Sequence, residues 1–309
     1  MAAWTGEQLL QNDMPPAVET MLSEDRLVHA LCIEGAPGTG RRQLAHSLAG
    51  AVLCERQQGR MCGECLACRK VIAGVHSDVI EPDGDGGDYK KDAMRRLRSD
   101  IYRSPSEGRA KVIILNNAES ITPEVQNLLL KVIEEPPENT YFFFTCDNRY
   151  KLLSTVRSRA VTVTLPSMSV PDCIAAVQAQ VVGKTEEEYR LAALYSDGSP
   201  GRAREMLENE AVMNRCRTAE AVLEALVKGG GYPLLTALLP AEKNRQEYTA
   251  VLVTADRLLG VSQLRDRLGI TVQKVIELKN ILAGGISKNE SNGYLPLISA
   301  AMAEEARRK

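Results

Sequence analysis

A glycine-rich segment near the N-terminus has the outline of a phosphate-binding loop. Residues 34–44 read Glu-Gly-Ala-Pro-Gly-Thr-Gly-Arg-Arg-Gln-Leu, between a strand-like apolar run and a helix-like one. Gly35 and Gly40 form a G-x-x-x-x-G frame, with Gly38 between them. Such a frame can present backbone N–H groups to an anion at a helix N-terminus, or it can serve only as a tight strand-to-helix turn.

The two residues after the frame are not those of a working loop. A lysine normally follows, to contact the terminal phosphates, and then a serine or threonine whose hydroxyl binds Mg²⁺. This chain has Arg41 and Arg42 instead. The guanidinium of Arg41 is bulkier than an ammonium and directs its donors differently, and a cation at Arg42 repels Mg²⁺.

A second loss is predicted at the end of another strand. Lys111 to Leu115 is an apolar run, and a nucleotide hydrolase carries an aspartate, often followed by a glutamate, after such a strand. This chain has Asn116 and Asn117. Neutral amides are poor ligands for Mg²⁺ and cannot accept a proton from water. We therefore expect that ATP and Mg²⁺ are not used by this chain.

Four cysteines have the spacing of a metal site. Cys54, Cys62, Cys65 and Cys68 form a C-x7-C-x2-C-x2-C pattern. Four thiolates complete the tetrahedral shell of a structural Zn²⁺ and leave no position open for catalysis. The alternative is that they are ordinary buried or reactive thiols. The remaining cysteines are interpreted as small core residues: Cys32, Cys146, Cys173 and Cys216.

Composition is that of an ordinary globular protein. The 309 residues are 44% hydrophobic and 25% charged, with a net charge of −2. Because there is no overall basic field, contact with DNA would have to be local or shared with partners. The sequence shows no secretory signal and no run long enough for a membrane helix. A cytoplasmic protein with reduced or metal-bound cysteines and no membrane contact is predicted.

The order of the predicted elements gives the fold class, α/β followed by all-α. Strands alternate with helices in the first half, which is typical of a parallel sheet with right-handed crossovers. Five strands are predicted, at 29–34, 76–81, 111–115, 141–145 and 161–165. An acidic loop at 83–88 and a basic helix at 92–102 are also predicted. Beyond residue 166 every signal is helical, including helices at 172–183, 185–195 and 201–208.

Several motifs together resemble one protein family. The run Gln126-Asn-Leu-Leu-Leu-Lys-Val-Ile-Glu-Glu-Pro-Pro137 is similar to a signature of the clamp-loader subunits of bacterial DNA polymerase III, which are AAA+ proteins. Arg26-Leu-Val-His-Ala before the glycine loop, the four cysteines after it, His76-Ser-Asp and Ser158-Arg159 follow in the same order. The resemblance extends over roughly residues 20–205, and beyond them it is one of position and class only.

The resemblance implies three domains. Residues 1–166 would be an AAA+ RecA-like α/β domain that carries a zinc module at 54–68. A small helical lid domain would occupy 167–210, and a C-terminal helical collar domain 211–309.

The resemblance also implies a division of labour between subunits. Arg41, Arg42, Asn116 and Asn117 fit the class of clamp-loader subunit that does not hydrolyse ATP. Such a subunit joins gamma/tau ATPase subunits and a delta subunit in a hetero-oligomeric ring, which loads the sliding clamp onto primed DNA. Arg159, after Ser158, would then be an arginine finger that acts in trans on the ATP of a neighbouring subunit.

Two alternatives remain open at this stage. The chain would be an active ATPase of the gamma/tau class if Arg41 replaced the missing lysine, and ATP turnover by the isolated chain would reveal this. It would be a free-standing, zinc-containing DNA-binding protein if it bound DNA alone with a salt-dependent affinity. The net charge of −2 disfavours the second alternative.

Overall fold

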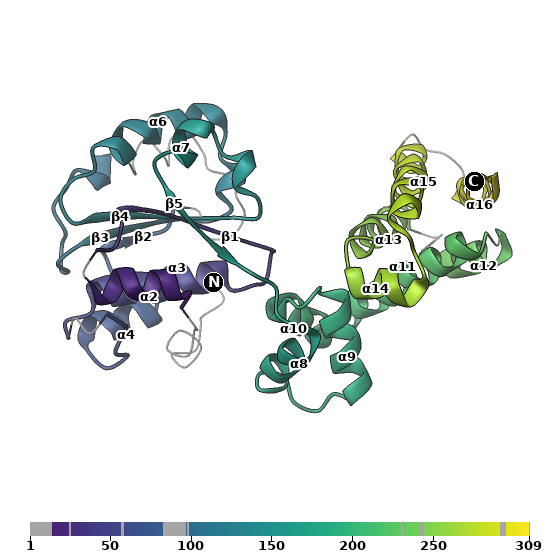
Figure 1. Ribbon diagram of the computed structural model, residues 1–309, viewed down its shortest axis with the longest axis horizontal. Helices are drawn as coiled ribbons and strands as arrows, with labels where there is room; N and C mark the ends of the chain where they lie inside the picture. The colour runs from purple at the N-terminus through teal and green to yellow at the C-terminus, as the bar shows by residue number, and fades with distance from the viewer. Residues whose placement is uncertain are drawn as a thin grey trace. The chain divides into compact units, whose positions relative to one another are not determined.

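The computed structural model describes residues 14–24, 26–56, 59–82, 97, 99–229, 231–241, 244–290 and 295–308. The chain divides into two compact units, Met1–Ser167 and Met168–Lys309. The first unit contains the sheet and the second is helical (Figure 1). The predicted acidic loop at 83–88 and most of the predicted basic helix at 92–102 lie outside the described residues.

The first unit is built on a parallel sheet of five strands in the order β2-β3-β4-β1-β5. The strands are β1 (Ala30–Gly35), β2 (Val79–Ile80), β3 (Lys111–Leu115), β4 (Thr140–Cys146) and β5 (Val161–Leu165). Because all five are parallel, their carboxyl ends gather at one edge of the sheet, where open α/β sheets place their ligands. The glycine loop begins at the end of β1 and therefore lies at this edge.

Helices cover both faces of the sheet (Figure 1). One face packs against α2 (Pro16–Ser23), α3 (Arg41–Leu53) and α4 (Leu66–Ile72), and the other against α6 (Pro123–Glu134) and α7 (Ser154–Arg157). Alternate residues of each strand enter the two cores, because successive strand side chains point to opposite faces. Burial on both faces explains why the strands read as continuous apolar runs.

The strands at 111–115 and 161–165 have the predicted bounds, but the strand predicted at 76–81 is shorter. Only Val79 and Ile80 pair with β3. The preceding Asp78 is fully buried, and its carboxylate accepts N–H donation from Ser106, Glu107 and Gly108. The His76-Ser-Asp motif therefore fixes this loop instead of extending the sheet.

Helix α3 also differs from the sequence-based expectation, which is a helix at 43–53 with Leu44, Leu48 and Val52 on one buried face. It begins at Arg41, directly after the glycine loop, and is buried on nearly all sides rather than along one face. The sheet covers one side of it, and α4 packs against it as well. Helix α6 begins at Pro123 after Thr122, and the side chain of Thr122 makes no capping hydrogen bond.

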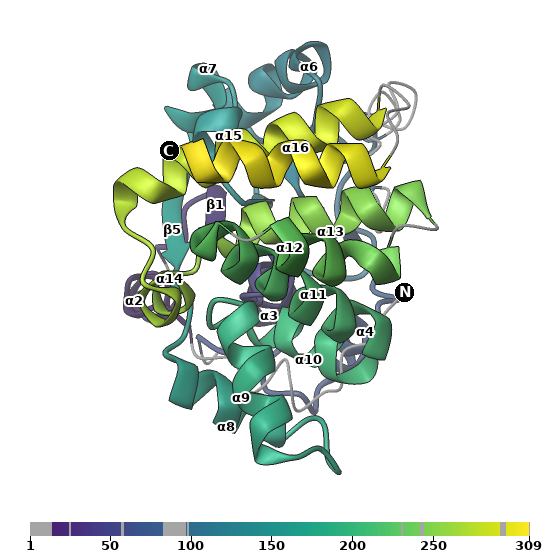
Figure 2. The same ribbon diagram turned by 90° about the vertical axis from the view of Figure 1, so that its right-hand side faces the viewer.

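The second unit consists of helices around one continuous hydrophobic core. They are α8 (Val170–Gln178), α9 (Glu186–Tyr195), α10 (Pro200–Glu208), α11 (Glu210–Lys228), α12 (Gly231–Leu238), α13 (Arg245–Leu258), α14 (Ser262–Leu268), α15 (Val272–Glu290) and α16 (Leu295–Arg308). Helices α11, α13, α15 and α16 contact one another in succession, and α12 contacts both α11 and α16 (Figure 2).

Helix α8 ends earlier than predicted, at Gln178, and begins earlier, after Ser169. The Ser169 hydroxyl accepts the N–H of Asp172, which fixes the helix start. Helix α9 begins with a capping box between Thr185 and Glu188. The division of this unit into a lid and a collar at residue 210 stays a prediction. None of the described helices is long and apolar enough to cross a membrane.

A tight turn at Gly198 allows a test of the second unit. Gly198 has a φ of +69°, and an added Cβ would lie 1.9 Å from the carbonyl oxygen of Met168. We expect Gly198→Ala to lower the free energy of unfolding by more than the roughly 1–2 kcal/mol of left-handed strain alone. Urea denaturation measures the loss.

The matched control is Gly183→Ala. Gly183 has a φ of +84°, but nothing lies within 4 Å of its added Cβ, so only the conformational strain applies. Equal losses at the two positions would contradict the clash with Met168.

Candidate functional site

The glycine loop makes a tight turn between β1 and α3. Gly38 and Gly40 have φ values of +85° and +90°, which disfavour residues with a side chain. At Gly35 an added Cβ would meet Thr39 Oγ1 at 2.8 Å and the carbonyl oxygen of Leu165 at 2.9 Å. The three glycines are therefore required by the turn itself, whether or not an anion binds there.

Arg41 lies where the lysine of a working loop would stand, and it turns inward. Its side chain is buried, and Nη2 donates to Oδ1 of Asn117 over 3.4 Å. Nη1 is buried without a hydrogen-bond partner. Asn117 has a φ of +46°, and its N–H donates to Thr145 Oγ1 over 3.1 Å. The positions of the two predicted losses, Arg41 and Asn117, are thus in direct contact.

The second arginine makes a stronger contact with a residue that sequence analysis missed. Arg42 Nε donates to Oε1 of Glu81 over 2.7 Å, and Nε2 of His46 lies 3.3 Å from Oε2 of Glu81. The side-chain amide of Asn116 also donates to Glu81, while its oxygen accepts from the Thr145 hydroxyl over 3.2 Å. We call Arg42, His46, Glu81 and Asn116 the Glu81 cluster.

Electrostatics keep the Glu81 carboxylate ionised. Its side chain is only 15% exposed, and burial alone would raise its pKa. The neighbouring His46 and Arg42 outweigh burial and leave the pKa of Glu81 below its ordinary value. The anion that balances Arg42 is therefore part of the protein.

The position of Glu81 explains both its role and why it was missed. It follows the two-residue strand β2, and Asn116 follows the neighbouring strand β3. The two side chains meet because parallel strands end at the same edge. The predicted longer strand at 76–81 included Glu81 as its last residue, without a partner. A carboxylate directly after a strand was the available signal.

The Glu81 cluster has a chemical consequence. In an ATPase, position 42 would bring a hydroxyl and position 116 a carboxylate to Mg²⁺. Here a guanidinium and an amide at these positions both donate to one carboxylate. The ion pair between Arg42 and Glu81 therefore lies where a metal ion would need oxygen ligands.

Arg159 makes its contacts with other residues than those of the glycine loop and the Glu81 cluster. It follows the short helix α7, and its Nη1 donates to the carbonyl oxygen of Thr155 over 2.9 Å and to Ser158 Oγ over 3.1 Å. Its Nη2 lies 2.6 Å from Oε1 of Glu134 on α6, and its side chain is 36% exposed. The guanidinium is thus ordered and accessible, and these partners come from α6 and α7 instead of the glycine loop.

The four predicted metal ligands are brought together. The Sγ atoms of Cys54, Cys62, Cys65 and Cys68 all lie within 4.8 Å of one another. The Sγ atoms of Cys62 and Cys68 are 3.8 Å apart, and a tetrahedral zinc ion with Zn–S bonds of about 2.3 Å would separate its sulfurs by about 3.8 Å. The donor set and its size therefore fit a structural zinc ion.

Helix ends and backbone donors hold these thiols in place. Cys54 ends α3 and Cys65 precedes α4, so two helix ends hold the cluster. The Cys65 N–H donates to Cys62 Sγ over 3.4 Å, and the Cys68 N–H donates to Cys65 Sγ over the same distance. The backbone N–H of Cys65, and after it that of Glu64, lower the pKa of Cys62 to about 6, whereas burial raises the pKa of Cys68. A thiolate is the form that binds zinc.

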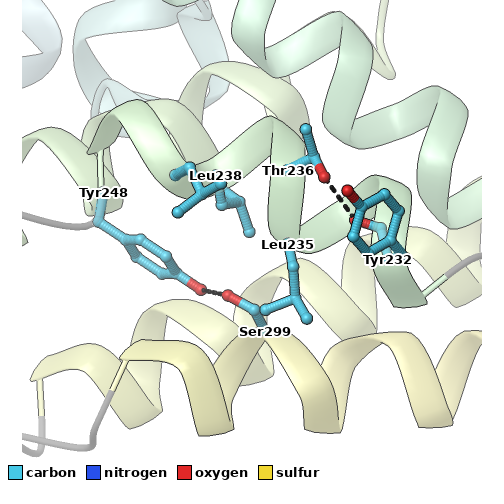
Figure 3. A pocket seen from close by; sticks show the side chains of 7 residues that line it. Tyr232, Leu235, Thr236, Leu238, Tyr248 and Ser299 are labelled. Carbon is cyan, nitrogen blue, oxygen red and sulfur yellow. Dashed lines mark hydrogen bonds between the residues drawn. The ribbon is translucent and has the colours of Figure 1, made fainter.

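The second unit contains a pocket of about 310 Å³ that is lined by uncharged side chains. Leucines and Tyr232 line it, and Tyr248 and Ser299 close it with a hydrogen bond of 2.9 Å between their hydroxyls (Figure 3). No lining residue carries a charge or a metal-binding side chain.

The sheet order and the glycine loop after β1 define the class, which is that of AAA+-like proteins with a phosphate-loop fold. The family described as "DNA polymerase III, delta subunit" matches residues 10–169. This chain belongs to the delta' family of DNA polymerase III clamp-loader subunits.

Curated relatives carry the name "DNA polymerase III subunit delta'". The protein of Yersinia pestis is 34% identical over 69% of this chain and 63% of its own length. That of Escherichia coli (strain K12) is 32% identical over 68% of this chain and 64% of its own length. That of Pseudomonas aeruginosa is 29% identical over 75% of this chain and 61% of its own length. The chain thus spans less than two thirds of the length of these relatives.

Among solved structures, a gamma subunit-related protein of Thermotoga maritima is 18% identical to this chain. It covers 94% of this chain and 98% of its own, with a TM-score of 0.47.

Removing the carboxylate of Glu81 tests the cluster. Glu81→Gln should lower the free energy of unfolding at pH 7 by roughly 2–3 kcal/mol, because Arg42 loses its partly buried counter-charge. The folded-state pKa of Glu81 is lowered, so its contribution is complete above the unfolded value of about 4.3 and disappears as pH falls through the lower folded value. Urea denaturation, with hydrogen exchange of the β3 amides, measures the loss.

The difference between Glu81→Gln and the unchanged protein should therefore shrink below about pH 4. Glu187→Gln is the control, because Glu187 forms an exposed pair with Arg190 and should change stability by no more than about 0.5 kcal/mol. A Glu81→Gln deficit no larger than that of the control would contradict the cluster.

Proposed function

We propose that this chain is a clamp-loader subunit that does not hydrolyse ATP and that supports its neighbours in the ring. The Glu81 cluster is the observation that carries the proposal. A metal ion entering this site would have to displace Arg42 from Glu81, where the two atoms are 2.7 Å apart, and would find an amide at Asn116 in place of a carboxylate.

The positive role of the chain in this proposal belongs to Arg159. An arginine finger stabilises the charge that develops on the transferred phosphoryl group, and it is worth about 10³–10⁵ in rate. The guanidinium of Arg159 is ordered by Thr155 and Ser158 but remains 36% exposed, which suits donation to another subunit. Ala160 replaces the cysteine that the family carries there and leaves the arginine in place.

The partners follow from this role. They are gamma/tau ATPase subunits and a delta subunit in a hetero-oligomeric ring, and the sliding clamp and primed DNA act through the assembly. A net charge of −2 supports indirect rather than independent DNA binding. A replication protein of this kind works in the cytoplasm, and no membrane takes part.

Zinc has a structural role in the proposal. The four thiolates of Cys54, Cys62, Cys65 and Cys68 would complete its shell, so the ion supplies folding free energy and no reactive position. Ion pairs from Arg60 to Glu19 and from Lys70 to Glu107 attach the surrounding segment to the rest of the first unit.

An active ATPase of the gamma class is the second candidate. A gamma subunit of Buchnera aphidicola is 31% identical to this chain over 52% of this chain and 44% of its own length. The candidate requires Arg41 to contact phosphates, whereas Arg41 is directed toward Asn117. It also requires a base after β3, and Glu119, the first acid there, accepts the N–H of Asp147 instead.

Arg159→Ala tests the proposed function. In a ring assembled with the ATPase subunits, the variant should slow DNA-stimulated ATP turnover at the neighbouring site by about 10³-fold or more, because the transition-state charge loses its partner. If the ATP sites of the ring hydrolyse independently, only the site that Arg159 serves should be slowed. Single-turnover hydrolysis in the assembled ring measures it.

The matched control is Arg103→Ala, since Arg103 is an exposed arginine that pairs with Asp100 over 3.2 Å. It should leave turnover unchanged. Unchanged turnover with Arg159→Ala would remove the role in trans, and magnesium-dependent hydrolysis by the isolated chain would favour the second candidate.

Metal analysis tests the zinc module. Purified protein should contain one zinc ion per chain, and Cys65→Ser should lose it and destabilise residues 54–68, because the shell falls below four thiolates. Cys173→Ala is the control, because Cys173 is a buried core cysteine of the second unit. It should keep the zinc. Protein without zinc would contradict this role.

A further inference from the structure

Glu134 holds the guanidinium of Arg159 in the isolated subunit. Its Oε1 lies 2.6 Å from Nη2 of Arg159, and the side chains are 44% and 36% exposed. Nη1 of Arg159 is engaged by Thr155 and Ser158 on the other side. A carboxylate therefore occupies the Nη2 side of the guanidinium, which could otherwise meet the phosphate of a nucleotide.

Glu134 stands at an electrostatically unfavourable position in its own helix. It is the last residue of α6, and Glu135 follows it as the C-cap. Helix C-termini carry a partial negative charge, so a glutamate there is unfavourable and a cation is preferred. The Pro136-Pro137 pair stops the helix at this point, so Glu134 cannot move into a further turn. Its contact with Arg159 compensates for this unfavourable position.

We propose that Glu134 is a positioning residue that retains Arg159 until the phosphate of a neighbouring nucleotide displaces it. The proposal rests on the proposed role of Arg159 in trans. An exposed pair of this kind is weak, so a polyphosphate with several charges can replace the carboxylate. The contact thus orders the arginine before assembly and opposes its engagement by a small amount.

The test uses Glu134→Gln in the assembled ring, with ATP turnover measured without DNA. Loss of the competing carboxylate should raise kcat/KM at the site that Arg159 serves by about two- to fivefold. A residue with a purely structural role would lower turnover or leave it unchanged. Glu135→Gln is the matched control, because it removes the adjacent charge at the same helix end.

A double-mutant cycle assigns the effect to Arg159. In the Arg159→Ala background Glu134→Gln should change nothing, because the arginine that it retains is absent. In the isolated chain, rotation of the ¹⁵N-labelled Arg159 guanidinium should become faster with Glu134→Gln and not with Glu135→Gln. This measurement does not depend on the ring.

The outcomes separate the two proposals. If Arg159→Ala does not slow turnover, the proposed function fails, whatever Glu134→Gln does. If Arg159→Ala slows turnover but Glu134→Gln does not raise it, or lowers it as well, the retaining role of Glu134 is overturned. Guanidinium rotation that is unchanged by Glu134→Gln would overturn it too.

Discussion

The first unit depends on the contact between the Glu81 carboxylate and the side chains that surround it. A buried charge is costly unless it is paired and hydrogen-bonded. Glu81 meets this condition with Arg42, His46 and Asn116, which come from α3 and from the end of β3. These contacts lie at the carboxyl edge of the sheet, where open α/β sheets place their ligands.

This arrangement links the glycine loop to the cysteine cluster through one helix. Helix α3 begins at Arg41, directly after Gly40, and Cys54 follows its last residue. Cys68 also approaches this helix, with its thiol 3.9 Å from the carbonyl oxygen of Gly50. The helix that carries Arg42 and His46 is therefore fixed at the loop by the Glu81 cluster and at its far end by the cysteines.

Much of this could be predicted from sequence, because the signals were local. The apolar runs at 111–115 and 161–165 gave correct strands, and the four cysteines are brought together as their spacing indicated. Arg41, Arg42, Asn116 and Asn117 were singled out from their place beside expected strands, and the loss of function at these positions stays a prediction. Their contacts could not be predicted, because Glu81 lies 39 residues from Arg42 and reaches it only through a strand of two residues. Glu134 was likewise hidden, since its ion pair with Arg159 joins the end of α6 to the turn that follows α7.

The Glu81 cluster also affects how this chain can evolve. Lysine and serine at positions 41 and 42 would remove the Arg42 cation that pairs with the Glu81 carboxylate. An aspartate introduced first would place a second negative charge beside Glu81, where Asn116 now donates a hydrogen bond. Each of these substitutions is therefore expected to destabilise the Glu81 cluster when it is made alone.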